Sequence, residues 1–586
     1  MFFLGVNFYG HNTSCALIKN GKLIYASEEE RFTRIKNDGS IPVNAIKDCL
    51  RFAKISLKDI SVIYASTVPE RLLKEKYLNY TIKNFPKANP IFFEKKTFKI
   101  MEFLNNAEKE IRSKIKFKGK IKFINHHLCH VASSHYLSGN TSSCAVSIDG
   151  LGEIESSTIY GIKNNNFKLL KKIDYPDSLG MFYSAITYFL GFRPNSSEGT
   201  VMALASFGNY NSIIPGKNKT YYDIFKTIIK KSKKNIFEIN LEWFNFPYSR
   251  VGWVSQKFIN FFGKPRLPDS QITQHYKNIA SAAQKIFEDY YIKILNEAYK
   301  ISKNKNLTLS GGCALNCKAN GLIYNKTKFN KVYIQPTAHD GGLSIGAAYI
   351  GFINSLKKKT KKNITYNHTY FGPNFSNKNI KKILKKNNIE FEYVLDFTKK
   401  CAEDLFNKKI CGLFQDRMEF GPRALGNRSI LSAPYPISKK KIINSIIKHR
   451  ESFRPFAPSI LEGFYEKYYE KNHNSPFMLI ATFLKKNKFK DKNKIIATLH
   501  NDYSARVQSV SKLTNKNYFK IIENFYKLSG VPVVLNTSFN DKGEPVVCNP
   551  LDALKSFFKT NLDVLYLQNF RILRSKNNIR NIKKIL

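Results

Sequence analysis

Two histidines four residues apart, His126 and His130, are the side chains in this sequence best suited to binding a metal ion. They follow an apolar, strand-like run and begin a stretch that favours a helix, where residues four apart share one face. Asp149 and Asp340, each followed by glycine, can add carboxylate oxygens. Imidazole nitrogens combined with carboxylate oxygens are typical of a catalytic first-row metal site with open positions. The simpler alternative is a histidine-rich helix start packed against a sheet.

A second set of candidate residues is rich in arginine and lysine and favours anion binding. Guanidinium groups match phosphate oxygens through paired hydrogen bonds, and amide or hydroxyl groups can orient a base, a ribose or a carbonyl. Structural ion pairs with Glu419, Glu451 or Asp502 are the alternative for two or three of these arginines. The set comprises Arg423, Arg428, Lys448, Arg450, Arg454, Arg506, Asn536, Ser538 and Asn540.

The elements that must position the histidines and aspartates form an α/β pattern. Residues 2–8, 15–18 and 23–26 predict three strands. Residues 143–159 predict a second strand-turn-strand unit around Asp149. Both units resemble the phosphate-binding hairpins of actin-like ATPases and sugar kinases.

A strand predicted at 307–310 runs into Gly311 and Gly312 and then into a helix. A loop of this kind presents backbone N–H groups to an anion. After the next strand, a further helix is expected to pack closely through Gly346 to Ala348. We therefore expect an α/β domain of two halves with a cleft between them.

The length of 586 residues exceeds what one hydrophobic core usually supports, so more than one domain is expected. The lysine-rich stretch within 357–368 is the predicted linker. We expect the first domain at 1–356, a second α/β domain at 369–575, and a frayed basic tail at 576–586.

The composition favours a folded protein of the cytoplasm. Hydrophobic residues make up 43% and aromatic residues 14%, which is enough for packed cores. The nine cysteines contain no Cys-x-x-Cys pair, so we expect free and mostly buried thiols in a reducing compartment. The sequence shows no apolar run of the ~18–20 residues that a membrane span needs, and its start does not resemble a signal peptide.

The formal net charge of +51 would normally suggest a polyanionic partner. The excess is mostly lysine beside asparagine and isoleucine, which is also what an AT-biased genome encodes. The arginines fall in separate motifs, and no nucleic-acid-binding module is recognisable. We expect no specific nucleic acid, whereas phosphorylated small molecules would benefit from the positive field.

Together these motifs resemble the NodU/CmcH-type carbamoyltransferases, which carbamoylate hydroxyl groups of sugars, nodulation factors and antibiotics. The resemblance runs nearly from end to end, and seven motifs occur in order. They are Glu29–Lys36, His126–His130, Asp149–Glu153, Gly311–Cys317, Gly421–Gly426, Phe453–Pro458 and Leu535–Asn540.

The resemblance implies a Kae1-like domain of the actin-like superfamily followed by a YrdC-like domain. In such proteins the YrdC-like domain joins carbamoyl phosphate and ATP, bound with Mg²⁺, into carbamoyl adenylate and releases pyrophosphate. The adenylate then passes within the chain to the Kae1-like domain. There, Fe(II) or a similar divalent metal and a bound nucleotide support transfer of the carbamoyl group to an acceptor hydroxyl.

The resemblance also implies roles for individual residues. His126, His130, Asp149 and Asp340 would bind the metal, with His127 as the rival of His126. His11 and Lys36 would lie near the transfer site, where a histidine such as His127 could act as general base. The nucleotide and adenylate sites would use Gly311, Gly312, Asn316, Arg423, Lys448, Arg450, Arg454, Arg506, Asn536 and Ser538.

Several alternatives stay open at this point. A threonylcarbamoyl-type tRNA-modifying enzyme uses the same two domain types, and the charge of +51 is its best support. A hydrogenase-maturation carbamoyltransferase would need acylphosphatase and zinc-finger modules, which the sequence lacks. A basic nucleotide-binding protein without catalysis is the alternative from another class.

The acceptor is expected to be a small molecule with a hydroxyl group, such as a sugar, a glycan precursor or a secondary metabolite. The aromatic residues of 209–266 are candidates for part of an acceptor wall because aromatic faces stack on sugar rings. They include Trp243, Phe244, Phe246, Tyr248 and Trp253. Core packing is the alternative for at least half of them. The oligomeric state is open, with a homodimer as one option.

Overall fold

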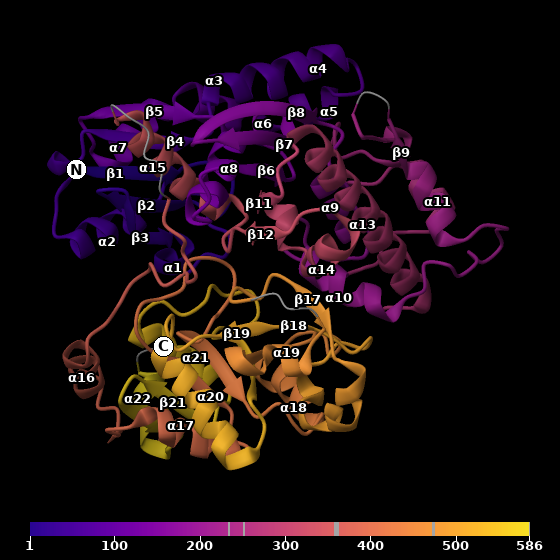
Figure 1. Cartoon of the computed structure of the whole chain (residues 1–586). Coiled ribbons are helices and arrows are strands. Elements are labelled where there is room, and N and C mark those ends of the chain that lie inside the picture. Colours follow the sequence, from indigo (N-terminus) through magenta and orange to yellow (C-terminus); the bar gives the residue numbers. More distant parts are fainter. Residues whose placement is uncertain (233–234, 250–251, 357–362, 471–474, 585–586) are drawn as a thin grey trace. The chain divides into compact units, whose positions relative to one another are not determined.

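The chain divides into two compact units. The computed structural model describes residues 1–586 except 233–234, 250–251, 357–362, 471–474 and 585–586 (Figure 1). The first unit consists of Met1–Glu29 and Gly39–Tyr366, and the second consists of Glu30–Asp38 and Asn367–Leu586. The division after Tyr366 falls within the predicted linker, whose residues 357–362 lie outside the described residues.

The first unit contains two five-stranded sheets. In strand order, the first sheet contains β3 (Lys22–Glu28), β2 (Ser14–Lys19), β1 (Phe2–Asn7), β4 (Val62–Ser66) and β5 (Lys120–Ile124). The second contains β12 (Lys331–Ile334), β11 (Asn306–Ser310), β6 (Ser143–Ile148), β7 (Glu155–Lys163) and β8 (Asn166–Asp174).

The two sheets have the same topology. In each, three consecutive strands form an antiparallel meander. A later strand pairs in parallel with the first of the three, and a further strand pairs in parallel with that one. The sequence shows no internal repeat, but the strand order is repeated. This duplicated arrangement agrees with the two α/β halves expected for the first domain.

Two helices connect these sheets through close packing. Helix α8 (His126–Leu137) follows β5, and α15 (Leu343–Asn354) follows β12; they pack against each other, while α15 also packs on β1. The approach depends on small residues, as predicted for 346–348. A Cβ atom on Gly346 would lie 1.9 Å from the carbonyl oxygen of Cys129.

Further helices surround the sheets of the first unit, and the two other short strands pair with each other. The main helices are α2 (Val43–Ala53), α6 (Lys95–Asn105), α7 (Ala107–Ile115), α9 (Leu179–Phe189), α10 (Glu198–Leu204), α11 (Tyr221–Ile228), α12 (Gln256–Phe262), α13 (Gln274–Ser302) and α14 (Cys317–Lys326). The short pair is β9 (Ile229–Lys231) with β10 (Phe237–Ile239).

The second unit is built on an eight-stranded mixed sheet. Its strand order is β13 (Glu392–Tyr393), β22 (Phe570–Leu573), β21 (Val564–Leu567), β14 (Cys411–Phe414), β15 (Arg428–Ser432), β20 (Val533–Ser538), β16 (Ala457–Leu461) and β19 (Gln508–Val510). Its main helices are α16 (Asn377–Lys386), α17 (Phe397–Phe406), α20 (Lys516–Ser529), α21 (Pro550–Lys559) and α22 (Lys576–Lys583).

Alternating residues of this sheet enter two separate cores. Leu413 and Leu431 pack in a cluster with residues of α17 and α20. Their neighbours Phe414 and Ile430 pack in a cluster with residues of α16 and α21. Because side chains alternate across a strand, both faces of the sheet are covered by helices.

A short N-terminal segment belongs to the second unit, which the prediction of contiguous domains did not include. Arg34 donates hydrogen bonds of 2.8 Å to the carbonyl oxygens of Pro545 and Val546. Phe32 packs against the apolar cluster that contains Met418 and Val546. The motif at 29–36 is thus divided between the two units after Glu29.

The C-terminal tail and the cysteines were also the subject of predictions. The basic tail is not frayed over its first part, because Asn578 and Ile582 of α22 are buried. The nine cysteines are free and buried, as expected. Among the described residues, the helices lack the combination of length and apolar character that crossing a membrane requires.

Candidate metal centre and anion-binding cluster

Four buried side chains of the first unit, His126, His130, Asp149 and Asp340, meet in one cluster. One ligand atom from each lies within 4.8 Å of the other three. His126 Nε2 lies 3.2 Å from Asp149 Oδ2 and 3.7 Å from Asp340 Oδ1. His130 Nε2 lies 3.7 Å and 3.6 Å from the same two oxygens.

Three elements bring these residues together. His126 and His130 lie in the first turns of α8, one helical turn apart, as the spacing predicts. Asp149 directly follows β6, and Asp340 begins the short 3-10 turn that leads into α15. The cluster therefore lies where α8 and α15 meet the end of β6.

His130 gives the clearest sign that the cluster fits a metal ion. Its side chain is fully buried, yet neither ring nitrogen has a hydrogen-bond partner among the described residues. Leaving a buried polar atom without a partner costs about 1–3 kcal/mol. A divalent cation bound by Nε2 would satisfy it, and two imidazoles with two carboxylates form an appropriate donor set.

The histidines and aspartates of the cluster shift one another's pKa values toward the charged forms. Burial raises the pKa of Asp149, but the hydrogen bond with His126 and the nearby ring of His130 outweigh it and hold that pKa well below its usual value. Burial lowers the pKa of His130, but the two aspartates raise it to about 9. A bound cation would replace the protons that the histidines otherwise carry.

The glycine loop at Gly311 and Gly312 supports Asp149 directly. The Gly312 N–H donates to Asp149 Oδ1 at 2.8 Å, which leaves Oδ2 facing the histidines. Gly311 has φ of +85°, and a Cβ there would lie 2.3 Å from the Ile148 carbonyl oxygen. Asn316 caps α14 by accepting from the Ala319 N–H. The predicted nucleotide role of this loop stays a prediction.

Glu153 anchors the start of α8, a role that was not predicted from the sequence. Its carboxylate accepts from the backbone N–H groups of His126 and Val68, and from the side chain of Asn125. The motif Asp149–Glu153 carried a signal for this role, because it places a second acidic residue four positions after the aspartate. The negative charge also suits a helix N-terminus.

His127 is placed differently from its two neighbours and does not fit the predicted role of general base. Its Nδ1 lies 3.2 Å from Thr158 Oγ1, and its Nε2 lies 3.0 Å from the Glu155 carbonyl oxygen. Burial lowers the pKa of His127 to about 3. Because the side chain is fully buried and both nitrogens are engaged, we assign it to α8–β7 packing.

His11 lies at the open side of the cluster. Its Nε2 is 3.8 Å from Asp340 Oδ2, and its side chain is 42% exposed. It comes from the loop after β1, so a residue far from the ligands in sequence reaches the same site. This placement is consistent with a side chain that can meet a substrate.

The second unit contains a cluster of four buried or half-buried cations, Lys448, Arg450, Arg454 and Arg506. Burial and the charges of Arg450 and Arg454 hold the pKa of Lys448 well below its usual value. Burial and the charges of Arg454 and Arg506 likewise lower the pKa of Arg450. Each of the four cations therefore lies near others of the group that repel it, and an anion would relieve that repulsion.

Polar groups hold this cation cluster in place. Lys448 Nζ donates to Asn540 Oδ1 at 2.7 Å and to the Ser538 carbonyl oxygen at 3.0 Å. Asn444, which was not predicted as a site residue, accepts from Arg450 Nε at 2.8 Å. The same asparagine donates to the Arg454 carbonyl oxygen at 2.9 Å and so shapes the 450–454 loop.

Other predicted members of the anion site differ in their surroundings. Asn536 Nδ2 lies 3.2 Å from the Ala424 carbonyl oxygen, next to Arg423, and contacts Gln508. Arg428 is fully buried and does not fit anion binding. Its guanidinium donates to the carbonyl oxygens of Gln415, Asn427, Pro373 and Asp416 and stacks on Phe414.

Lys36 also lies in the second unit, since the segment Glu30–Asp38 belongs there. Its Nζ pairs with Glu30 Oε1 at 3.0 Å. Its charge adds to the lowering of the pKa of Lys448. The structure thus groups Lys36 with the cations of the second unit, whereas the sequence-based prediction placed it with His11.

Three of the five candidate acceptor-wall residues form a small aromatic core instead, as the core-packing alternative expects for at least half of them. Trp243, Phe244 and Phe246 are almost fully buried. The rings of Trp243 and Phe258 lie 6.0 Å apart, and those of Phe244 and Phe246 lie 5.5 Å apart. Trp243, Phe244 and Phe246 cannot stack on a ligand without opening that core. The other two candidates, Tyr248 and Trp253, are only half-buried.

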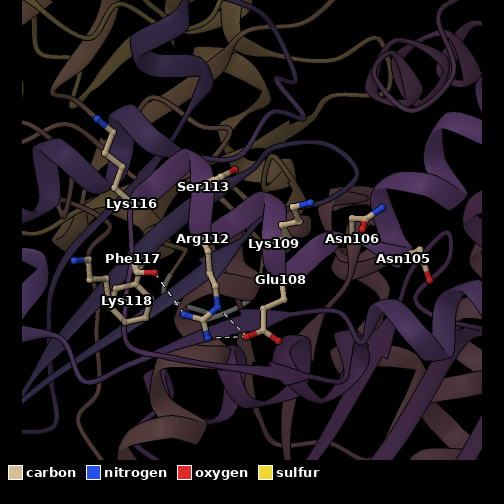
Figure 2. Close-up of a pocket in the computed structure, with 9 residues that line it drawn as sticks. All are labelled: Asn105, Asn106, Glu108, Lys109, Arg112, Ser113, Lys116, Phe117 and Lys118. Atoms are coloured by element: carbon tan, nitrogen blue, oxygen red, sulfur yellow. Dashed lines mark hydrogen bonds and ion pairs between the residues drawn. The ribbon is translucent and has the colours of Figure 1, made fainter.

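A separate surface cavity of about 720 Å³ lies along α7 of the first unit and contains none of the predicted site residues. Figure 2 shows its central side chain, Arg112, bound to Glu108 and to the Phe117 carbonyl oxygen. Since its guanidinium is already engaged, we assign no function to this cavity.

Comparisons with known proteins address the family directly. Models of the carbamoyltransferase N-terminus and C-terminus match residues 3–349 and 402–574. The uncharacterized protein sll1178 of Synechocystis is 35% identical, covering 97% of this chain and 96% of its own length. Nodulation protein NolNO of Sinorhizobium fredii is 31% identical over 97% of this chain and 79% of its own.

Likeness to solved structures is weaker. Full-length HypF in its phosphate- and nucleotide-bound form is 12% identical, with a TM-score of 0.32 over 61% of this chain and 56% of that one. A likeness of this degree supports no argument about fold or function. The two family models and the nearly full-length relatives show that this chain is an enzyme of the carbamoyltransferase family.

Proposed function

We propose that this carbamoyltransferase joins carbamoyl phosphate and ATP into carbamoyl adenylate in the second unit and transfers the carbamoyl group to an acceptor hydroxyl in the first. The observation that carries the first step is the cluster formed by Lys448, Arg450, Arg454 and Arg506. Two polyanions, carbamoyl phosphate and Mg·ATP, must approach each other in this reaction. Buried cations that repel one another stabilise bound anions and lower that repulsion.

The second step is assigned to the cluster of His126, His130, Asp149 and Asp340. A divalent ion such as Fe(II), when bound by these residues, supplies a Lewis acid able to polarise the carbamoyl oxygen. His11 lies beside Asp340 and can accept the proton of the acceptor hydroxyl. The acceptor is proposed to be a sugar or another small molecule with a hydroxyl group.

The chain's domain organisation suits a reactive intermediate. Carbamoyl adenylate hydrolyses readily, so two sites in one polypeptide reduce its exposure to water. We propose that the second unit is YrdC-like and that the first unit is Kae1-like. The dense arginine and lysine motifs favour this over a tRNA-modifying enzyme, whose best support is the net charge of +51.

The test measures pyrophosphate release from Mg·ATP with and without carbamoyl phosphate, using protein loaded anaerobically with Fe(II). Release that depends on carbamoyl phosphate is the expected result. Lys448→Met should abolish it, whereas His130→Gln should retain it and lose only the transfer step. Lys512→Met, at an exposed lysine of the second unit, is the matched control and should behave like the wild type.

Well-folded, metal-loaded protein that releases no pyrophosphate with carbamoyl phosphate would contradict the adenylate mechanism. Release that appears only with threonine, bicarbonate and ATP would instead favour the threonylcarbamoyl alternative. Equal loss in Lys448→Met and Lys512→Met would show a general effect of charge and not a defined site.

A further inference from the structure

We propose that Asn12 and Glu28 position His11 for proton transfer by fixing which of its ring nitrogens carries hydrogen. This inference rests on the proposed transfer of a carbamoyl group at the cluster of the first unit. Asn12 and Glu28 are positioning residues, because they act on the reaction only through His11. All of the contacts involved lie within the first unit.

The contacts form a line that starts at the ring of His11. His11 Nδ1 lies 2.8 Å from Asn12 Oδ1. Asn12 Nδ2 lies 3.4 Å from Glu28 Oε1. His339 Nε2 lies 3.5 Å from that same Glu28 oxygen.

The direction of these hydrogen bonds follows from the carboxylate of Glu28. A carboxylate oxygen can only accept, so Asn12 turns its NH₂ group toward Glu28 Oε1. This orientation leaves Asn12 Oδ1, which can only accept, facing His11. At the far end of the line, the Gly341 N–H donates to His339 Nδ1 at 3.0 Å.

The consequence for His11 is a single tautomer. Because Asn12 Oδ1 can only accept, His11 Nδ1 must carry the hydrogen. The lone pair of Nε2 is then directed toward the cluster, where this nitrogen lies 3.8 Å from Asp340 Oδ2. A histidine with the opposite tautomer would present an N–H there and could not take a proton from an acceptor hydroxyl.

The local backbone is built to hold this arrangement. Asn12 has φ of +54°, a left-handed conformation that asparagine tolerates better than most residues. The buried side chain of Asn7 donates to the carbonyl oxygens of both His11 and Asn12 at 3.3 Å. Glu28 is almost fully buried at the end of β3.

Gly341 packs closely against Glu28 and His339. A Cβ atom there would lie 3.0 Å from Glu28 Oε1 and 2.7 Å from His339 Cε1. A side chain at this position would therefore crowd both His339 and Glu28. This gives a physical reason for glycine directly after the ligand Asp340, beside its role in the turn.

This arrangement serves the transfer of the carbamoyl group from the adenylate to the acceptor hydroxyl. The acceptor hydroxyl oxygen bonds to the carbamoyl carbon, and its proton moves to His11 Nε2. The bond between that carbon and the adenylate phosphate oxygen breaks, and AMP leaves with the bonding electrons. The imidazolium then shares its Nδ1 hydrogen with Asn12, whose amide is in turn held by Glu28.

The experiment compares Asn12→Gly, Asn12→Asp and the double variant Asn12→Asp/Glu28→Gln. Glycine keeps the left-handed backbone and removes only the amide. Aspartate keeps an oxygen for His11 but sets a carboxylate against Glu28, and glutamine at 28 restores a donor. Asn20→Gly, at another left-handed asparagine in the turn between β2 and β3, is the matched control.

Activity is followed with labelled carbamoyl phosphate and glucosamine as the acceptor probe. We expect Asn12→Gly to lower kcat of transfer by about 10–100-fold, less than the roughly 10²–10⁴-fold that a general base itself contributes, because His11 is still present. KM for glucosamine and pyrophosphate release should stay as in the wild type. Asn12→Asp should be impaired, and the double variant should recover a large part of the loss.

A second readout is independent of catalysis. In metal-free protein labelled with ¹⁵N-histidine, held at a pH high enough for His11 to be neutral, the resonances of His11, assigned through His11→Asn, should report hydrogen on Nδ1 alone. In Asn12→Gly they should report a mixture of the two tautomers, and in Asn20→Gly they should be unchanged. This signature does not depend on the substrate.

The outcomes separate the two proposals. A wild type that adenylates but carbamoylates no glucosamine leaves the tautomer signature to decide the inference. A wild type without carbamoyl-phosphate-dependent pyrophosphate release contradicts the proposed function only. An unchanged tautomer in Asn12→Gly, or equal impairment of Asn12→Asp and the double variant, overturns the positioning role.

Discussion

His127 and His130 show how residues of one type on one helix can differ in function. Both are fully buried on α8. His127 uses both ring nitrogens in hydrogen bonds to β7, whereas neither nitrogen of His130 has such a partner among the described residues. The spacing of His126 and His130 predicted the pair correctly, because it depends only on helix geometry. It could not place His127, whose partners Thr158 and Glu155 come from a strand some thirty residues away.

The contrast gives the first prediction at the residue scale. His130→Gln should lower affinity for Fe(II) by at least about 10–100-fold, the loss that even outer partners of a metal ligand cause. It should also remove the increase in Tm on adding metal. His127→Gln should lower Tm equally with and without metal, because its role is packing. Metal analysis and thermal unfolding test both, and loss of metal in His127→Gln alone would reverse the assignment.

A second prediction concerns His135, which is buried and hydrogen-bonded to Ser143 Oγ at 2.8 Å and to Asn165 Oδ1 at 2.9 Å. Burial lowers its pKa to about 4, below the value of 6.5 expected in the unfolded chain. The unfolded state therefore binds more protons, and stability is lost as the pH falls from 6.5 through 4. The loss should approach about 3 kcal/mol at the acid end.

His135→Phe removes this titration while keeping a ring in the site. Its free energy of unfolding in urea should depend less on pH between 7 and 4.5 than that of the wild type. The two proteins are compared by the slope of this dependence and not at a single pH, because the variant also loses two hydrogen bonds. Parallel pH profiles for the two proteins would contradict the prediction.

At the scale of elements, the strands and helices near the metal centre were predictable because each has a local signal. The turn at Asn20 and Gly21 marks β2 and β3, and the glycines at 341–342 and 346 mark the start and packing face of α15. The duplicated strand order was not predictable, since the two sheets share topology without sharing sequence. Nor was the role of Glu153, whose contacts with Val68 and His126 join segments far apart in the chain.

The packing of α8 on α15 gives a prediction at this scale. Gly346→Ala places a Cβ 1.9 Å from the Cys129 carbonyl oxygen, and this backbone contact cannot be relieved by a side-chain rotation. We expect a loss of about 1–3 kcal/mol in stability from overpacking. Because α8 carries two ligands and α15 follows Asp340, metal affinity should fall as well.

Gly199→Ala is the control for this variant. Gly199 lies in α10, and a Cβ atom added there would meet no described atom within 4 Å, so alanine should be neutral or slightly stabilising. Urea unfolding and metal analysis are carried out on both proteins. If Gly346→Ala is as stable and binds as much metal as Gly199→Ala, then α8 and α15 can move apart at little cost in free energy.

Over the whole molecule, the two units are not contiguous in sequence. Glu30–Asp38 lies in the second unit although its neighbours on both sides lie in the first. The motif at 29–36 was recognisable in the sequence but was placed entirely with the first domain, because propensity and spacing carry no information on which surface a short segment contacts. The contacts of Arg34 with Pro545 and Val546 span more than five hundred residues.

This connection leads to a prediction about how the segment serves the anion-binding cluster. Arg34 bonds to two carbonyl oxygens and lies 3.5 Å from Asp552 Oδ2, and Lys36 follows two residues later. Arg34→Ala should release the segment, at a cost of about 1–3 kcal/mol for the lost charged hydrogen bonds. Amide hydrogen exchange should then increase in 30–38. Carbamoyl-phosphate-dependent pyrophosphate release should fall further than the loss of folded protein explains, because the charge of Lys36 no longer acts on Lys448.

Arg580→Ala, at an exposed arginine of α22 in the same unit, separates loss of charge from loss of contact. It removes the same charge and should change neither exchange in 30–38 nor pyrophosphate release. If Arg34→Ala exchanges faster in 30–38 yet releases pyrophosphate at the wild-type rate, the segment serves stability alone. Faster exchange together with slower release would mean that nine residues from the N-terminal part of the chain complete the anion-binding cluster of the second unit.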